Sequence, residues 1–449
     1  MSVESEATEM AEIRSMAGPL RTAADLDPLV ERLAGERIIA IGEASHGTHE
    51  FYAWRCELSR RLIEGGGISF IAVEGDWPDC WRIDQWVRGR EDASGRQDAC
   101  DVHGLHLDAR HLLAHFERWP RWMWANEEVA DFLDWLRDRN LQRPMDERVG
   151  FFGLDVYSLW ESLREVFGWL ERNAPEALGA AMRAWECFAP FGEEPQRYAH
   201  STALVPASCE DDVVALLVAV RHRVAREALP DEGAFGAVQN AAVVAGAERY
   251  YRAMMRSDRE SWNVRDIHMA DTLDRLLGHV GARSRALVWA HNTHVGDSRA
   301  TDMAAAGMVN IGEILRDRHD DEGVALVGFA GHRGSVVAAA AWGATELALP
   351  VPAARLGSHE DLLHRALGSP ALLIFPHRRG GLWLRMRRGH RAIGVVYRPE
   401  RESGNYVPTI MGDRYDALLW LEDTSALTPL RHEVLAAPGA ELETEPSGY

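Results

Sequence analysis

Short apolar runs that end abruptly at an acidic residue or a histidine recur five times in this chain of 449 residues. Helix-like stretches separate the runs, and this alternation is typical of buried parallel strands joined by helices. The runs are Ile38 to Ile41, Phe70 to Val73, Val149 to Leu154, Ala286 to Ala290 and Val324 to Ala330. The carboxyl ends of parallel strands share one edge of a sheet, where such sheets bind ligands. We therefore expect the Glu, Asp and His residues that follow the runs to meet in one cleft.

The predicted fold is α/β, with a mainly parallel central sheet flanked by helices and a large all-helical insertion that covers the cleft. The insertion follows from the stretch between Pro175 and about Gly281, which carries almost no strand signal. The predicted segments are an N-terminal helical segment (1–36), two parts of the α/β core (37–156 and 284–432), the insertion (157–283) and a flexible tail (433–449). Further strand candidates are 335–342, 371–375, 392–397 and 417–421.

Composition restricts the partners and the compartment. The formal net charge of −20 argues against a general nucleic-acid binder, which needs a basic surface. The five cysteines are scattered, odd in number and without a C-x-x-C pair, so we expect no disulfide framework and a reducing cytoplasm. The N-terminus has no apolar signal segment, and no apolar stretch is long enough to span a bilayer. The partner we expect is a small molecule, and the sequence does not indicate an oligomeric state.

Glu43 and His46 follow the first apolar run within the segment GEASHG. A carboxylate three residues from an imidazole can fix its tautomer, and the imidazole can then act as a general base on water. A helix cap and a hydrogen-bonded buried histidine would explain the same two residues. Arg55 lies in the helix expected next and could reach back to hold a carbonyl or an oxyanion, or could form a surface ion pair.

Glu74 follows the second run, and a right-handed βαβ unit would place it beside Glu43. Two close carboxylates raise the pKa of one of them, which suits acid–base chemistry, although either acid could simply pair with an arginine. Asp76 and Asp155 also stand at strand ends, and we assign them to substrate binding. No G-x-S-x-G segment occurs, which argues against a serine nucleophile of the α/β-hydrolase type.

His291 and His294 follow the fourth run, within the segment HNTH. Together with Glu43, His46 and Glu74, histidines here could ligate one divalent metal such as zinc. They could equally serve as neutral donors and acceptors in a site without a metal. The spacing of two histidines alone does not decide between these alternatives.

Four segments in this order resemble the erythromycin esterase family. They are GEASHGTHEFYAWR (Gly42 to Arg55), VEGDWPD (Val73 to Asp79), WNVRDIHMA (Trp262 to Ala270) and VWAHNTHVGD (Val288 to Asp297). The resemblance runs from about Ile38 to about Leu421. It implies a hydrolase that opens ester bonds without a serine nucleophile, in which His46 is the general base on water. Glu43, Glu74, Arg55 and His291 then take the other catalytic positions, and His294 and Arg265 contribute to substrate binding.

Three hypotheses follow. The first is an esterase or lactonase that needs no cofactor, with Arg55 or a histidine of the HNTH segment on the oxyanion; macrolides are candidate substrates, and antibiotic resistance would be the corresponding role. The second is a metal-dependent hydrolase with Glu43, His46, Glu74 and His291 as ligands. The third is a non-catalytic binder of a small hydrophobic molecule. Many ionisable groups at strand ends favour an enzyme over a passive pocket.

Overall fold

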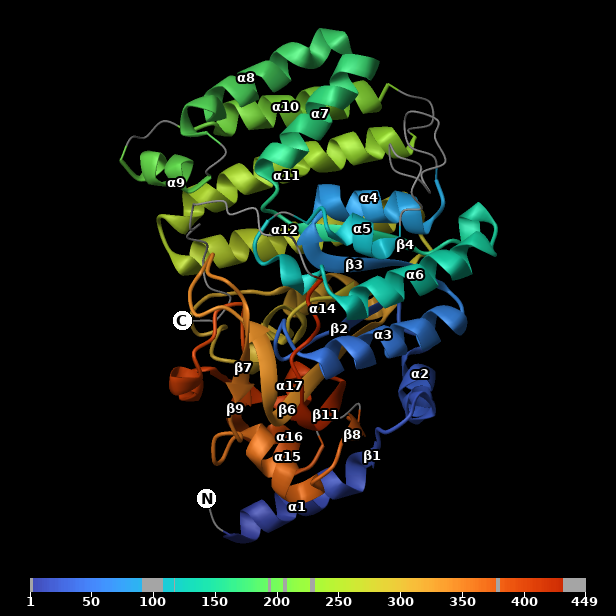
Figure 1. Cartoon of the computed structure of the whole chain (residues 1–449), viewed down its shortest axis with the longest axis vertical. Coiled ribbons are helices and arrows are strands. Elements are labelled where there is room, and N and C mark those ends of the chain that lie inside the picture. Colours follow the sequence, from blue (N-terminus) through green and yellow to red (C-terminus); the bar gives the residue numbers. More distant parts are fainter. Residues whose placement is uncertain are drawn as a thin grey trace.

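The computed structural model describes residues 3–90, 108–116, 118–192, 195–204, 208–226, 231–376 and 380–430. The predicted tail at 433–449 lies outside the described residues. The centre is a nine-stranded sheet in the order β1–β8–β11–β6–β2–β5–β3–β4, with β7 beside β6 (Figure 1). Its strands are β1 (Ala17–Pro19), β2 (Ile38–Ile41), β3 (Ile68–Asp76), β4 (Gly150–Asp155), β5 (Arg285–Trp289), β6 (Val324–Ala338), β7 (Leu347–Val351), β8 (Ala371–Ile374) and β11 (Ala417–Thr424).

Most of the sheet is parallel. Strands β4, β3, β5, β2, β6 and β11 run in one direction, and β1, β7 and β8 pair antiparallel with their neighbours. A separate two-stranded sheet pairs β9 (Arg387–Arg391) with β10 (Tyr406–Ile410). The predicted α/β class with a mainly parallel sheet is confirmed.

Helices cover both faces of the sheet, because the side chains of its strands alternate between two cores. Ile39 and Ile41 pack with α2 (Asp27–Leu33), α3 (His49–Glu64) and α6 (Glu127–Leu141). Ile38 and Ala40 pack on the other face with α12 (Asp258–Val280), α14 (Ile311–His319) and α15 (His359–Leu367). Both faces being apolar explains why β2 reads as an uninterrupted hydrophobic run.

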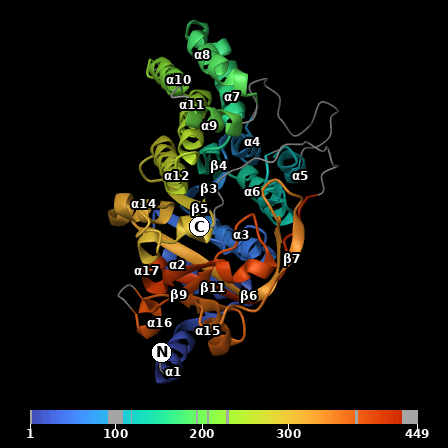
Figure 2. The ribbon, with the colours of Figure 1, turned by 90° about the vertical axis from the view of Figure 1, so that its left-hand side faces the viewer.

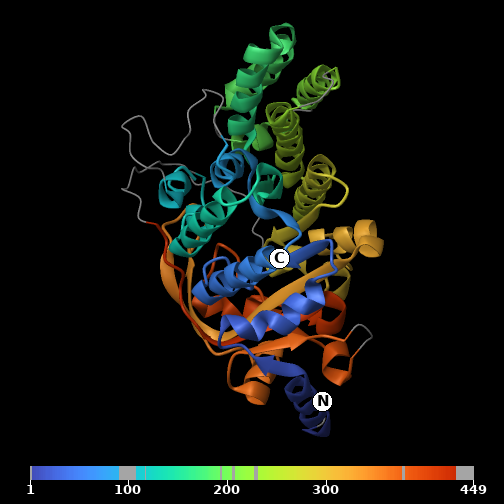
Figure 3. The same cartoon turned by 90° about the vertical axis from the view of Figure 1, so that its right-hand side faces the viewer.

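The helices between β4 and β5 have a core of their own, which is the predicted insertion. They are α7 (Leu159–Asn173), α8 (Leu178–Phe188), α9 (Pro195–Leu204), α10 (Glu210–Val224), α11 (Glu232–Met254) and α12. α11 packs on α7, α10 and α12, and α12 packs on β4. Figures 2 and 3 show α8 and α10 stacked away from the sheet, with α12 beside it. The helix of the insertion nearest the strand ends is therefore α12. The predicted segment boundaries stay a prediction.

Two of the strand predictions were wrong. The run from Val324 does not end at His332, since β6 continues as one strand to Ala338 with β11 and β7 as partners. Between residues 392 and 397 there are isolated bridges from Ile393 and Val396, and the nearest strand is β9. Polar and glycine residues in β6 read as a loop, yet β11 pairs with the stretch from Gly331 to Gly334 and β7 pairs with β6 from Gly334 onwards, which holds the chain extended.

Cys187 and Cys209 form a disulfide across the insertion, which the scattered cysteines did not lead us to expect. It joins the end of α8 to the residue before α10, two segments separated by the linker that contains α9. Cys56 and Cys80 are buried free thiols. No helix within the described ranges is both long and apolar enough to cross a membrane.

Buried His268 in α12 should make stability depend on pH. Burial first, and then the charge of Arg275, lower the pKa of His268 from 6.5 to about 3. As the pH falls, His268 therefore binds a proton in the unfolded chain before it does so in the folded protein. The stabilisation from the neutral His268 is complete above the pKa of the unfolded state and is lost as the pH falls towards the pKa of the folded state. Lowering the pH from about 7.5 to about 5 should reduce the free energy of unfolding by about 2 kcal/mol through His268.

His268→Leu is expected to remove this part of the pH dependence, which urea unfolding at the two pH values measures. The exposed His222 in α10 provides the control, because His222→Leu should leave the wild-type dependence intact. Identical pH dependence in the wild-type and His268→Leu proteins would contradict the prediction.

Candidate active site

The loop between β2 and α3 is held rigidly by its backbone. Gly47 O accepts hydrogen bonds from Val337 N and Leu427 N, and Ala44 O accepts one from Ile393 N. Two of its positions have no room for a side chain. A Cβ on Gly42 would lie 2.1 Å from Asn292 Oδ1, and a Cβ on Gly47 would lie 1.9 Å from Val337 O. The glycines therefore allow the loop to pack closely enough to fix the residues between them.

Glu43 orients His46, as the spacing predicted. His46 Nδ1 lies 2.8 Å from Glu43 Oε1, and both side chains are 1% exposed. A carboxylate accepts this bond, so the proton of the neutral ring is on Nδ1 and the lone pair is on Nε2. Nε2 is buried without a hydrogen-bond partner among the described residues. The ring is therefore a positioned proton acceptor.

Arg55 holds Glu43 from the side opposite His46. Its Nη1 lies 3.0 Å from Glu43 Oε2, and the side chain is fully buried. The guanidinium lies over the rings of Tyr52 and Trp289, at 4.4 and 4.9 Å from their centroids. Such contacts suit a cation that stays charged away from water. Arg55 thus lies behind Glu43, away from the space in front of His46.

Strand β5 lies between β2 and β3, so the expected contact of Glu43 with Glu74 through neighbouring strands is wrong. The segment that follows β5 bridges the two acids instead. Asn292 N donates to Glu43 O at 2.8 Å, and His291 N donates to the Glu74 Oε2 at 2.8 Å. The HNTH segment, as the short helix α13 (Asn292–Val295) and the residue before it, is therefore the centre of the site.

His291 has the opposite tautomer to His46. Its Nδ1 accepts from Thr293 N at 3.3 Å and lies 2.8 Å from Thr293 Oγ1, so the ring proton is on Nε2. That Nε2 also has no partner among the described residues. Burial first, and then the neighbouring His46, hold the pKa of His291 well below its usual range. The two rings lie 4.8 Å apart, one offering a lone pair and the other a neutral N–H.

Glu74 is surrounded by donors rather than by another acid. Its Oε1 accepts from Arg265 Nη2 at 2.8 Å and lies 3.4 Å from His294 Nε2. Burial would raise its pKa, but the charges of His294 and Arg265 outweigh burial and bring the pKa of Glu74 well below its usual range. The expected raised pKa in a carboxylate pair is therefore not found at Glu74. This side chain remains an anion next to His46.

Arg265 of α12 ties the acids at two strand ends together. Besides Glu74, it donates to both oxygens of Asp155 at 3.0 and 2.7 Å. His294 completes the cluster, since its Nδ1 lies 2.9 Å from Asp266 Oδ1 and its ring stacks on Trp262 at 4.6 Å. Burial would lower the pKa of His294, but Asp266 and Glu74 raise it. These residues form a buried ionic network beneath the site.

A cavity of about 40 Å³ opens in front of His46. Its polar wall consists of His46, Glu74, Asp76, Asp155, Arg265 and Arg118. Its other wall consists of Gly75, Phe116, Pro120, Met123, Trp124, Tyr157, Trp342 and Val395. Arg118 Nε donates to Asp76 Oδ2 at 2.6 Å and lies over the Tyr157 ring. The volume has room for about three water molecules.

Four of the five predicted strand ends converge and five of the nine predicted site residues line the cavity, whereas His332, which follows the fifth run, lies outside it. Glu43, Arg55, His291 and His294 surround it without lining it. Sequence reasoning missed the contributions of Phe116, Arg118, Pro120, Met123, Trp124, Tyr157, Trp342 and Val395. These come from loops without periodicity, and their one common signal is a high aromatic content. Within the described chain, the alternative ligands Glu43, His46, Glu74 and His291 do not form a group with metal-ligand proximity.

The erythromycin esterase family model matches residues 63–424 of the chain. A stretch of 134 residues is 28% identical to erythromycin esterase type II of Escherichia coli. That stretch covers 29% of this chain and 26% of the relative, so it spans about a quarter of the relative's length.

Three solved structures share the fold. A succinoglycan biosynthesis protein has a TM-score of 0.74 at 18% identity, over 95% of this chain and 100% of that chain. A protein from Bacillus cereus has a TM-score of 0.75 at 16% identity, over 95% and 99%. A mutant of the erythromycin esterase EreC in its open conformation has a TM-score of 0.65 at 15% identity, over 93% and 97%. At these identities the likeness shows the fold alone.

Proposed function

Because the chain belongs to the erythromycin esterase family, we propose that it hydrolyses a carboxylic ester or lactone by direct attack of water, without a serine nucleophile and without a cofactor. The observation that carries the proposal is the unpartnered Nε2 of His46, a lone pair fixed by Glu43 and facing a cavity that Glu74 also lines. A general base needs this combination of reach, tautomer and exclusion of bulk solvent.

In the proposed reaction, His46 Nε2 removes a proton from a water molecule as its oxygen attacks the carbonyl carbon. The protonated ring then returns the proton to the leaving alkoxide, which gives an acid and an alcohol. Glu74 accepts a hydrogen bond from the second hydrogen of the water and stabilises the positive charge on His46. Its lowered pKa supports this anionic role rather than a shared proton.

We assign the oxyanion contact to the Nε2–H of His291. A neutral N–H without a partner, 4.8 Å from His46 by ring centroids, is the kind of donor that stabilises developing charge. Arg55 fits this task less well because its guanidinium already pairs with Glu43 and lies over the rings of Tyr52 and Trp289. Arg55 is therefore a positioning residue that holds the carboxylate of Glu43 in place.

The substrate must be mainly apolar where it meets the aromatic wall. A drug-sized ligand needs a pocket of about 300–1,000 Å³, far more than the 40 Å³ seen here. Trp342 of the cavity wall packs against Trp119, with ring centroids 4.3 Å apart and Trp119 Nε1 donating to Ala344 O at 3.1 Å. We propose that this pair separates to admit a lactone, whereas a short ester needs less movement. A macrolide remains a candidate substrate, with antibiotic resistance as the corresponding role.

The test is a substrate panel with purified protein in the presence and absence of a chelator. The panel contains nitrophenyl esters of increasing acyl length, small lactones and a macrolide. The proposal expects turnover of at least one ester or lactone that the chelator does not reduce. Saturable binding without turnover across the panel would support the passive binder, and loss of turnover on chelation would support the metal-dependent hydrolase.

A further inference from the structure

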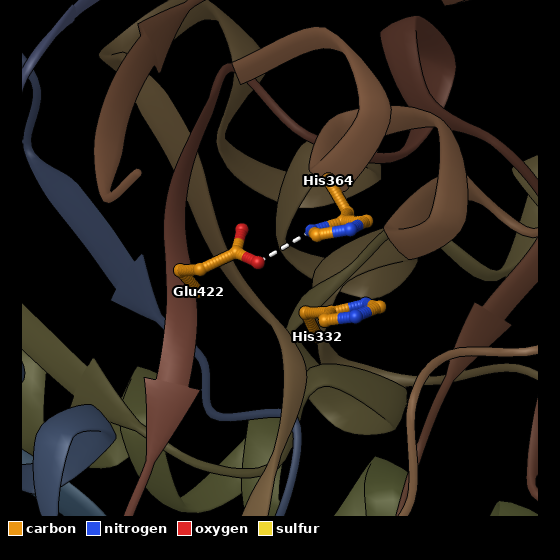
Figure 4. Close-up of side chains that lie close together, drawn as sticks. All are labelled: His332, His364 and Glu422. Carbon is orange, nitrogen blue, oxygen red and sulfur yellow. Dashed lines mark hydrogen bonds and ion pairs between the residues drawn. The ribbon is translucent and has the colours of Figure 1, made fainter. Parts of the chain in front are cut away.

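A second cluster of ionisable side chains lies outside the cavity. It consists of His332 in β6, His364 in α15 and Glu422 in β11, as Figure 4 shows. Strands β6 and β11 pair in parallel, with Gly331 opposite Leu421 and Arg333 opposite Asp423, so Glu422 falls opposite His332. One ligand atom from each of the three side chains lies within 4.8 Å of the others.

The cluster leaves buried polar atoms without partners. His332 is 5% exposed, and its Nδ1 has no hydrogen-bond partner among the described residues. Glu422 Oε1 pairs with His364 Nδ1, but the buried Glu422 Oε2 has no partner either. Buried polar atoms without partners destabilise the folded protein. A ring nitrogen and a carboxylate oxygen both coordinate metal cations, so a bound cation would be a partner for both atoms.

We infer that His332, His364 and Glu422 form a binding site for a divalent transition metal, with Zn²⁺ as the best match to two imidazoles and one carboxylate. Three protein ligands leave a fourth, tetrahedral position for water. This site does not depend on the proposed ester hydrolysis, since none of its residues lines the cavity. The metal would instead link α15 to two strands of the sheet.

The geometry requires a small movement. The two rings are parallel, with centroids 3.9 Å apart, whereas a metal must lie in the plane of each ligating ring. Zinc bonds of about 2.0–2.2 Å place tetrahedral ligand atoms about 3.3–3.6 Å apart. The ligand atoms here lie within 4.8 Å of one another, so they have to approach more closely. His364 can turn, because its side chain is 39% exposed at the surface. Rotation about its Cβ–Cγ bond brings a ring nitrogen towards the other ligands.

The charges around the cluster permit a cation. The two nearby arginines are paired with acids: Arg391 lies 2.7 Å from Glu402, and Arg333 lies 2.7 Å from Asp423. Their positive charge at the site is thereby reduced, and Glu422 supplies the negative charge for the metal.

The experiment titrates chelator-stripped full-length protein with Zn²⁺ in competition with a chromogenic chelator, and with Co²⁺ while its visible absorption is recorded. We expect one equivalent to bind, with the absorption of four-coordinate Co²⁺. His364→Asn and Glu422→Gln should each weaken binding by more than about 100-fold, because even residues that only support a ligand contribute about 10–100-fold. Circular dichroism checks that both variants are folded.

Two controls separate this site from others. His319 pairs with Asp274 and Glu322 in another histidine–carboxylate group, and His319→Asn should not change the affinity. Binding that His46→Asn abolishes and His364→Asn leaves intact would place the metal in the cavity and overturn the inference. Absence of binding to the wild-type protein at about 100 equivalents of Zn²⁺ would overturn it as well. Hydrolysis should be unchanged in His364→Asn.

Discussion

Replacement of His46 by Asn is expected to lower kcat for the best ester or lactone by about 10²–10⁴-fold. Asn can still donate a hydrogen bond towards Glu43, but it offers no nitrogen lone pair to accept a proton from water. The side chain is similar in size and lies in a loop held by backbone hydrogen bonds, so the fold should survive. Initial rates and circular dichroism of the two proteins measure this effect.

His49 provides the matched control, since it lies three residues further along the chain. It is 46% exposed and bonds to Glu128, so His49→Asn should keep the wild-type rate. Glu43→Gln should give an intermediate rate, because an amide can pair with either tautomer of His46 and no longer selects one. A folded His46→Asn protein that retains the full rate would show that another group is the base.

Arg265→Met is expected to destabilise the protein by about 3–5 kcal/mol, the usual result of removing one partner of a buried ion pair. Arg265 is 6% exposed and neutralises both Glu74 and Asp155. It helps to hold the pKa of each acid below its usual range against burial, which would raise it. Two buried carboxylates without this partner would have to remain unpaired or bind protons.

Urea unfolding at neutral pH measures the loss. Arg275, in the same helix, is the matched control because it hydrogen-bonds to the neutral groups of Gln239 and Thr272, so Arg275→Met should cost much less. In the wild-type protein, the stabilisation from lowered carboxylate pKa values is present above the unfolded pKa and is lost as acid protonates the folded protein. Equal unfolding free energies for the Arg265→Met and Arg275→Met proteins would contradict a role for the ionic network.

The strand ends were predictable because a buried parallel strand is apolar on both of its faces and therefore forms a continuous apolar run in the sequence. Ile38 to Ile41 is apolar on both faces, and the residues that follow it must leave the sheet at its ligand-binding edge. The order of the strands was not predictable in the same way. β5 lies between β2 and β3 although more than 200 residues separate it from either in sequence. Local patterns do not encode that choice, and the environment of Glu74 depends on it.

The apolar wall of the cavity was missed for a related reason. Trp124 and Trp342 come from irregular segments, whose positions are set by tertiary contacts rather than by periodicity. His332 shows the opposite error: the segment Gly331 to Gly334 reads as a loop, but β11 and β7 extend the strand through it. Tertiary pairing placed this histidine opposite Glu422, and not in the cleft where the strand-end pattern had placed it.

The direct attack of water is tested most directly by a single turnover in water labelled with oxygen-18, with the protein in excess over an ester substrate. If His46 activates water, the acid formed in this first turnover carries one labelled oxygen and the protein carries none. If Glu43 or Glu74 instead attacks the carbonyl and expels the alcohol, and water then opens the resulting anhydride at the carboxyl carbon of the protein, the acid of the first turnover is unlabelled and the label appears in a carboxylate of the protein. Mass spectrometry of the acid and of the intact protein gives the answer, and the second result would contradict the mechanism.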